Sequence, residues 1–437
     1  MAEPDARFMI DSGFDQRAQM QRLTDRRIRL SRAYEEQTRL ADGRLMLSAS
    51  ALREAASDGP IVVINVSALR CDALIVQASE PLVVTLPKLT YAEARSTAIR
   101  YHECLLATQA ATEAFFTARE AALDGGWEAH QLFLQASTEL RNARREVEKV
   151  LNDTARWLWE TVVQPVKARL VLRAADGVSP PRLWWCPTGP LVGLPLHTAS
   201  AGPDASAESV LDWVVSSYTP TVTALLSARR SAITQPTDAS NSTFLLLSLA
   251  ATPGQSLLPH VEKEAESILS RLPDDRVTVL ADGNATRRRV MQAFSAHRSI
   301  HLGCHAEQDL TDPSNGALIL YDGRLTVMDL GRSRFEGDFA YLSACKTAAG
   351  GIALPEESVS MAAALHFAGF RRVIATLWSV QDAAAARVAD LVYEQMSKSG
   401  RFTPALAATA LHRALVIVRA QNPGLPSRWS PFVHVGI

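Results

Sequence analysis

Short apolar segments alternate with helical stretches through the second half of this chain of 437 residues. A strand, a helix and a second strand in succession form a parallel pair, because the helix carries the chain back across the sheet. The pattern therefore predicts an α/β fold, with a largely parallel sheet and helices on both faces. Strands are predicted to begin at 244, 277, 299, 339 and 372, with helices at 261–272, 285–296 and 358–369.

The first 56 residues have another character. They are rich in arginine, and their leucines recur at helical rather than strand-like spacing. The Asp-Gly-Pro break at 58–60 ends this pattern. We therefore expect residues 1–56 to form a helical segment that precedes the β-containing part of the chain.

Residues 57–235 are expected to form a separate unit, since the chain is longer than one core usually supports. Two long helices, at 91–120 and at 129–163, would form an insertion, the second being closed by Pro165. The stretch 231–242 is rich in Ser, Thr, Asp and Pro, which is typical of a linker. The third unit would then span 236–437. Strands in the 57–235 unit are predicted at 61–66, 73–76 and 182–187.

Composition narrows the possible functions. The chain carries 45 basic and 46 acidic residues, so no net field favours nucleic acid or an anionic membrane. No apolar run is long enough to cross a bilayer, and the charged N-terminus is unlike a signal peptide. The 5 cysteines are odd in number and scattered, which indicates free thiols and a cytoplasmic location.

A nucleophile and a base are predicted at the ends of two strands. His305 comes just after the strand that begins at Ser299, and Cys345 just after the strand that ends at Ser343. Catalytic groups of open α/β sheets gather at the carboxyl ends of the strands. If these strands are neighbours, imidazole and thiol face each other across one rim. A free thiol has a pKa of about 8.5, so a nearby imidazole is needed to generate thiolate at neutral pH.

The order and spacing of motifs resemble those of the CHAT family of caspase-like cysteine peptidases, over about residues 150–437. In the C-terminal half they are HLGCH at 301–305, GALIL at 316–320, LSACKT at 342–347, AGFRRVIATLW at 368–378 and WSPF at 429–432. Upstream they are WETVVQP at 159–165, WCPTGPL at 185–191 and SYTPT at 217–221.

This resemblance implies a catalytic three-layer α/β/α domain at 236–437, preceded by a non-catalytic caspase-like subdomain at 57–235 and by N-terminal helices. It implies an endopeptidase that needs no cofactor and cleaves a protein substrate, with His305 as base and Cys345 as nucleophile. Backbone amides of Ala306 and Cys345 would donate to the oxyanion, although the family commonly has glycine at position 306. CHAT domains usually accompany helical repeats or sensor domains, which implies a regulatory protein partner.

A specificity residue is implied by WSVQD at 378–382. The segment resembles the part of the related separase whose acidic residue sits in the specificity pocket. Asp382 would then receive an Arg or Lys side chain of the substrate. Asp382 also immediately precedes the predicted helix 383–396, where it is a candidate N-cap, and the two roles are compatible.

Two other functions remain to be weighed against the peptidase. His301, Cys304 and His305 together suggest a metal site, but on a strand position 304 points away from the other two, so we expect no metal. The second alternative is a caspase-like scaffold for protein interaction or signalling without turnover. Ala306 in place of glycine favours the scaffold, whereas the intact His305 and Cys345 favour the enzyme.

Overall fold

The computed structural model describes residues 47–172, 179–204, 206–235, 243–272, 276–307, 315–343, 360–378, 380, 382–398 and 401–437. Residues 51–437 form one compact unit. The predicted helical segment 1–56 lies outside the described residues except at its end, where α2 spans Ala49–Ala55.

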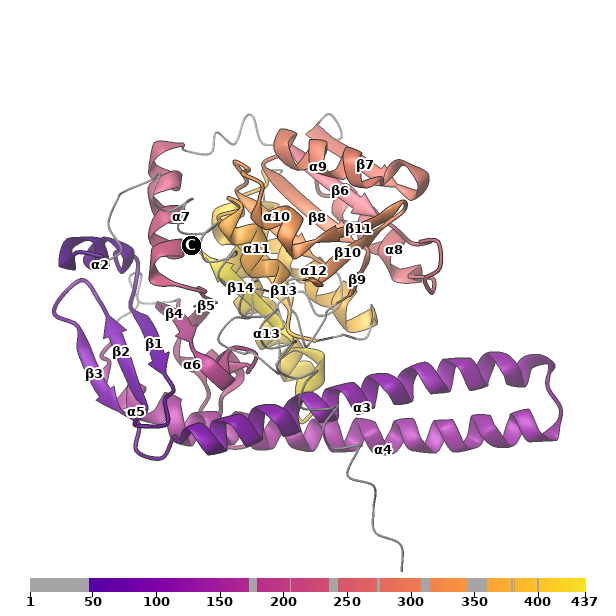
Figure 1. The fold of residues 1–437 in the computed structure, drawn as a ribbon, viewed down its shortest axis with the longest axis horizontal. Helices are drawn as coiled ribbons and strands as arrows, with labels where there is room; N and C mark the ends of the chain where they lie inside the picture. Colours follow the sequence, from indigo (N-terminus) through magenta and orange to yellow (C-terminus); the bar gives the residue numbers. More distant parts are fainter. Residues whose placement is uncertain are drawn as a thin grey trace, which may run out of the picture. The chain divides into compact units, whose positions relative to one another are not determined.

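One large sheet forms the centre of this unit (Figure 1). In the described residues its strands are β1 Ile61–Asn65, β2 Asp72–Val76, β3 Leu82–Thr85, β4 Arg182–Pro187, β5 Val215–Tyr218, β6 Phe244–Ser248, β7 Val277–Ala281, β8 Ser299–Gly303, β12 Phe339–Leu342, β13 Arg372–Thr376 and β14 Phe432–Gly436. Their order is β3-β2-β1-β4-β5-β14-β13-β12-β8-β6-β7. Most neighbours are parallel, as predicted; the antiparallel pairs are β1 with β2, β2 with β3, and β13 with β14.

Helices cover both faces of the sheet, which confirms the layered α/β prediction. Because successive side chains of a strand point to opposite faces, the apolar strands supply two separate cores. Helices α8 (Pro259–Leu269), α12 (Asp382–Met396) and α13 (Ala407–Gln421) pack on the face that carries Phe244 and Tyr341. Helices α9 (Arg287–Ala296) and α11 (Met361–Phe367) pack on the face that carries Leu245 and Leu302.

The strands of the two units predicted at 57–235 and 236–437 form two blocks of this one sheet. The blocks join where β5 pairs with β14. Side chains reinforce the joint: the Trp184 indole donates to the Gly436 carbonyl oxygen at 2.7 Å, and His434 Nδ1 lies 2.9 Å from Ser217 Oγ. The most C-terminal strand therefore lies in the interior of the sheet.

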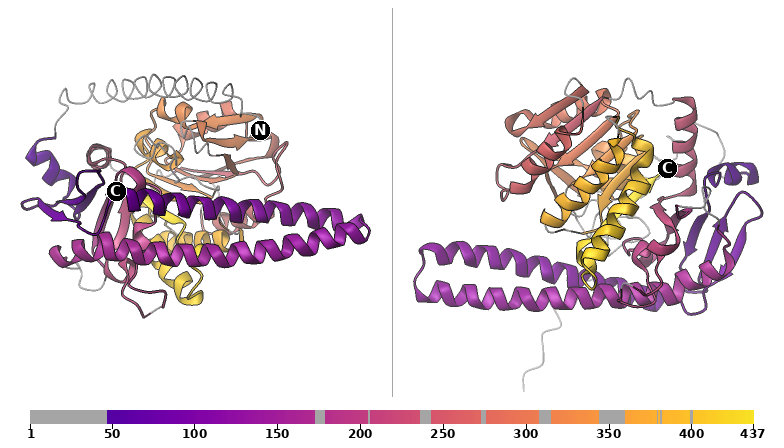
Figure 2. Two further views of the ribbon diagram at one scale, coloured as in Figure 1. Left: turned by 60° about the horizontal axis from the view of Figure 1, so that its bottom comes forward. Right: turned by 180° about the vertical axis from the view of Figure 1, so that it is seen from behind.

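The chain between β3 and β4 forms two long helices that run side by side (Figure 2). They are α3 (Tyr91–Asp124) and α4 (Trp127–Leu158), and Gly125 and Gly126 separate them as the sequence predicts. The prediction that Pro165 closes the second helix is wrong. A π-helical turn at Trp159–Val163 leads into α5 (Gln164–Arg169), so the helical backbone continues past Pro165, which lies in the first turn of α5.

The predicted linker 231–242 begins too early. Helix α7 spans Val222–Thr234, so the first four positions of that stretch are helical, and Gln235 closes the helix by donating its N–H to Ser231. Polar composition alone does not end a helix whose inner face is anchored by buried residues, here Leu225 and Leu226. Residues 236–242 lie outside the described part of the chain.

Gly369, between α11 and β13, is predicted to be irreplaceable. Its φ is +118°, and a Cβ atom at this position would lie 1.9 Å from the Phe335 carbonyl oxygen. Gly369→Ala should therefore lower the free energy of unfolding by about 2 to 4 kcal/mol, measured by chemical denaturation. Gly331→Ala is the matched control, because a Cβ there meets open space, and it should change stability by less than about 1 kcal/mol. Equal costs at both positions would contradict the prediction.

Candidate active site

His305 lies on a small second sheet rather than at the end of β8 itself. It begins β9 (His305–Glu307), which pairs with β10 (Ala317–Leu320), and β10 pairs with β11 (Gly323–Thr326). The sequence pattern does not indicate this sheet. His305 is half-buried, and its Nε2 lies 2.7 Å from the carbonyl oxygen of Ser256 in the loop before α8. A carbonyl only accepts, so Nε2 carries the hydrogen and Nδ1 keeps the lone pair of the neutral ring.

The strand that leads to Cys345 is a direct neighbour of the strand that leads to His305. β12 pairs in parallel with β8, with Leu342 opposite Leu302, as the rim hypothesis requires. The Ser343 N–H then donates to the Leu302 carbonyl oxygen at 3.0 Å. Cys345 lies outside the described residues, two positions beyond Ser343.

Helix α8 packs closely against the end of β8. A Cβ atom on Gly303 would lie 2.9 Å from Val261 Cγ1, so the glycine permits this approach. The loop before the helix is closed by a bond from Leu258 N–H to the Ala250 carbonyl oxygen at 2.9 Å. The same loop holds Ser256, so the packing of α8 fixes the partner of His305.

Ala306 follows His305 on β9 and pairs with Leu318 of β10. Its half-buried methyl group packs against the apolar core. The methyl group that replaces the usual glycine hydrogen is therefore accommodated by packing. The predicted oxyanion role of its backbone amide stays a prediction.

Asp382 is the first residue of α12 rather than the residue before it. A carboxylate in the first turn stabilises a helix through the N-terminal end of the helix dipole. The side chain of Asp382 lies outside the described part of the structure.

Upstream of Asp382, the buried Trp378 packs edge-to-face on Tyr101 of α3, with ring centroids 5.7 Å apart. The start of the long helical hairpin thus contacts the segment that leads to Asp382.

The other cysteines are poorly suited to nucleophilic chemistry. Cys71, Cys186 and Cys304 are buried, and Cys104 on α3 is half-buried. Burial raises the pKa of Cys186 to about 12 and also raises the pKa of Cys104. Cys304, between β8 and β9, is 1% exposed.

Sequence reasoning missed Glu264, which is buried beside the strand ends. Its Oε2 accepts a hydrogen bond from Ser343 Oγ at 2.6 Å, and its Oε1 lies 3.6 Å from His301 Nε2. The signal in the sequence was a carboxylate in an apolar stripe: Val261, Glu264, Ala265 and Ile268 occupy one face of α8. His301 was weighed as a metal ligand in the sequence. In the structure its Nδ1 lies 3.0 Å from the Tyr393 hydroxyl oxygen.

In the described residues no cluster of three or more His, Cys, Asp or Glu side chains is placed to hold a metal ion. Nor does any described helix have the length and apolar character needed to span a membrane. His197 is a buried residue outside the candidate site: its Nδ1 lies 2.9 Å from the Tyr218 hydroxyl, and burial lowers its pKa to about 3.

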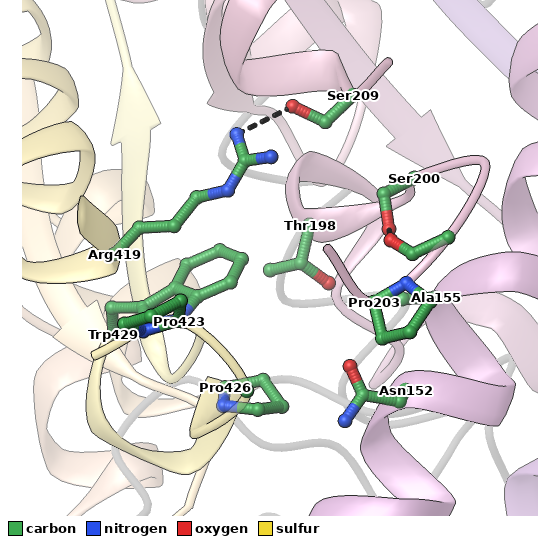
Figure 3. A pocket seen from close by; sticks show the side chains of 12 residues that line it. Asn152, Ala155, Thr198, Ser200, Pro203, Ser209, Arg419, Pro423, Pro426 and Trp429 are labelled. Carbon is green, nitrogen blue, oxygen red and sulfur yellow. Dashed lines mark hydrogen bonds between the residues drawn. The ribbon is translucent and has the colours of Figure 1, made fainter. Parts of the chain in front are cut away.

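A cavity lies between α4, the loop at 198–209 and the segment 419–429 (Figure 3). Arg419 Nη1 donates to Ser209 Oγ at 2.8 Å on its wall. No predicted site residue lines it, so it gives no support to the active-site hypothesis. Its lining is Asn152, Ala155, Thr198, Ser200, Gly202, Pro203, Ser209, Arg419, Pro423, Gly424, Pro426 and Trp429.

Comparison with known proteins gives a family and a fold. A family model described as the CHAT domain matches residues 152–437. Two crystal structures of the Saccharomyces cerevisiae separase–securin complex match with TM-scores of 0.55 and 0.58, at 8% and 9% identity. Each match covers 89% of this chain but 30% of the matched chain, so this chain spans less than a third of its length.

A weaker likeness is to the Arg-specific cysteine proteinase gingipain R of Porphyromonas gingivalis, with a TM-score of 0.39, 12% identity, and coverage of 66% of this chain and 67% of the other. Among curated proteins, none matches the sequence. The separase likeness confirms the predicted caspase-like α/β fold.

Proposed function

Because this chain belongs to the CHAT-domain family and has a caspase-like fold, we propose that it is a cysteine endopeptidase with Cys345 as nucleophile and His305 as base. One observation carries the proposal. The two residues follow adjacent parallel strands, β12 and β8, at the carboxyl edge of the sheet where such sites form. The bond from Nε2 to Ser256 leaves Nδ1 available as the base.

In the proposed reaction, His305 Nδ1 takes the proton of the Cys345 thiol, and the thiolate attacks the carbonyl carbon of the scissile peptide. The backbone amides of Ala306 and Cys345 stabilise the oxyanion that forms. The imidazolium then gives its proton to the leaving amine, and a thioester remains. Water, deprotonated by the same imidazole, hydrolyses the thioester and restores the thiol.

The test is a comparison of new N-termini in a cell proteome after incubation with the wild-type protein or with Cys345→Ala. We expect a set of cleavages that appears with the wild type and not with the variant. A proteome in which both proteins produce the same N-termini would contradict the peptidase. The scaffold alternative, which Ala306 favours, is tested with an acyl-type electrophile: failure of Cys345 to react would support the scaffold.

Specificity for a basic residue is part of the same proposal. If Asp382 lines the pocket, cleavage follows Arg or Lys, with Arg preferred because its planar fork can pair both carboxylate oxygens. Asp382→Asn should then weaken transition-state binding of basic substrates by about 2 kcal/mol or more. A peptide-library profile measures this effect.

The control for Asp382→Asn is Glu394→Gln, which removes an exposed charge from the same helix and should leave the profile unchanged. Cleavage after acidic or bulky apolar residues, insensitive to Asp382→Asn, would restrict Asp382 to a role in its helix.

We also propose that a partner protein regulates this activity in the cytoplasm. The separase of the matched structures is bound to securin, which motivates the proposal. Free thiols and the contact of the α3–α4 hairpin with Trp378 are consistent with it. Affinity purification of Cys345→Ala from the cytosol would identify the partner, and an equal rate of cleavage with and without that partner would contradict regulation.

A further inference from the structure

A buried polar cluster lies at the ends of β8 and β12, and the mechanism above does not use it. It consists of the buried Glu264 of α8, His301 of β8, Tyr341 of β12 and Tyr393 of α12, together with the half-buried Ser343 just after β12. Glu264 is 6% exposed and His301 2%. A buried carboxylate is costly unless its partners compensate the loss of water, so its presence at this point requires a reason.

One oxygen of Glu264 holds the segment that leads to Cys345. Ser343 Oγ donates to Oε2 at 2.6 Å, a charge-assisted bond. In addition, the Ser343 N–H donates a hydrogen bond to the Leu302 carbonyl oxygen at 3.0 Å. Ser343 is therefore fixed through its side chain and its backbone, two residues before the proposed nucleophile.

The other oxygen of Glu264 faces β8, the strand that leads to His305. Oε1 has no hydrogen-bond partner in the described residues and lies 3.6 Å from His301 Nε2. The His301 ring stacks on Tyr341 at 5.2 Å between centroids, and its Nδ1 meets the Tyr393 hydroxyl at 3.0 Å. When Tyr393 donates to Nδ1, the ring hydrogen is on Nε2 and is directed toward Glu264.

The same helix reaches His305 itself. The loop before α8 supplies the Ser256 carbonyl to His305 Nε2 at 2.7 Å. Contacts from α8 and this loop thus reach both segments that carry the proposed catalytic groups. A shift of about 1 Å in such a segment can cost on the order of a hundredfold in rate.

We propose that Glu264 is a positioning residue of the peptidase site. It binds Ser343, two residues before Cys345, and its other oxygen faces His301 of β8, the strand before His305. This inference rests on the proposed function for its role in catalysis. The positioning can be tested apart from peptide cleavage, because a base held near Cys345, as the proposed function requires, also sets how fast the thiol reacts with a small electrophile.

The experiment uses Glu264→Ala, Glu264→Gln and Ser343→Ala in the full chain. For a substrate found by the N-terminus comparison, kcat per folded molecule should fall on the order of a hundredfold in Glu264→Ala and Ser343→Ala, with KM nearly unchanged. The double variant should be no worse than either single one, because both remove the same bond. Glu264→Gln keeps an oxygen acceptor for Ser343 and should stay within about tenfold of wild type.

Ser267→Ala is the matched control. Ser267 lies on the same helix and donates to a carboxylate, Asp390 of α12, at 2.8 Å, but this pair ties α8 to α12 and not to a strand end. Ser267→Ala should lower the free energy of unfolding by about as much as Ser343→Ala and leave kcat per folded molecule unchanged. If Glu264→Ala behaves like Ser267→Ala, the positioning role is overturned and Glu264 is a structural residue only.

Alkylation of Cys345 by iodoacetamide at neutral pH gives a readout that needs no substrate. Glu264→Ala should slow it about tenfold relative to folded wild type, because the thiol loses the nearby base. Slowed alkylation in a protein that shows no Cys345-dependent cleavage would refute the peptidase and support the positioning. Normal cleavage and normal alkylation in Glu264→Ala would refute the positioning and leave the peptidase standing.

Discussion

Replacing Cys345 by alanine is expected to abolish proteolysis and leave the fold intact. The covalent route needs the sulfur atom, and neither alanine nor a neighbouring side chain can take its place. We expect kcat/KM to fall by about a thousandfold or more, which corresponds to about 4 kcal/mol of lost transition-state stabilisation. The removal of a single thiol group should change the free energy of unfolding by less than about 1 kcal/mol. Cleavage of a peptide substrate and chemical denaturation measure the two effects.

Cys104→Ala is the matched control for Cys345→Ala. Cys104 is half-buried on α3, and burial raises its pKa, so it holds little thiolate at neutral pH. Its replacement should leave both cleavage and labelling by an acyl-type electrophile unchanged. Residual cleavage by Cys345→Ala within about tenfold of wild type would exclude Cys345 from the mechanism.

His305→Ala should be comparably inactive, for a different reason. Without the imidazole, the thiolate fraction at neutral pH falls and no group protonates the leaving amine. The variant also leaves the Ser256 carbonyl without its donor, which should cost about 1 kcal/mol of stability. We expect a loss of kcat/KM of about a thousandfold or more, measured on the same substrate as for Cys345→Ala.

The pH dependence of Cys345 labelling separates a base from a structural histidine. In His305→Ala, labelling should be slow at neutral pH and rise as the pH passes about 8.5, where an isolated thiol ionises by itself. In His130→Ala, which removes an exposed histidine of α4, labelling and cleavage should match wild type. Labelling of His305→Ala that equals wild type at neutral pH would show that His305 does not activate the thiol.

The common edge of β8 and β12 could be predicted because it follows from general rules, whereas their adjacency was only a condition of the hypothesis. Alternating strands and helices specify a parallel sheet, and residues at the ends of parallel strands share one edge. The pairing of Leu302 with Leu342 shows that the two strands are also direct neighbours. The family motifs then pointed to His305 and Cys345 at that edge.

The rest of the site depended on contacts that a single sequence does not specify. The strand His305–Glu307 is too short and polar to show alternation, so its pairing with Ala317–Leu320 could not be predicted from periodicity. The Ser256 carbonyl is a backbone group, so no residue type marks it. Glu264 did stand out in an apolar stripe, but its bond to Ser343 depends on how α8 packs over the sheet.

The interior position of β14 also affects how the chain can fold during synthesis. Strand β5 is complete at Tyr218, but its partner β14 exists only after residues 219–431 have been made. Until then the edge of β5 presents unpaired backbone groups to any other chain nearby. Pairing across such a long stretch is slow, and the exposed edge favours aggregation in the meantime. The yield of folded protein in the cell should therefore depend on chaperones that shield nascent strands, even if the folded protein itself is stable.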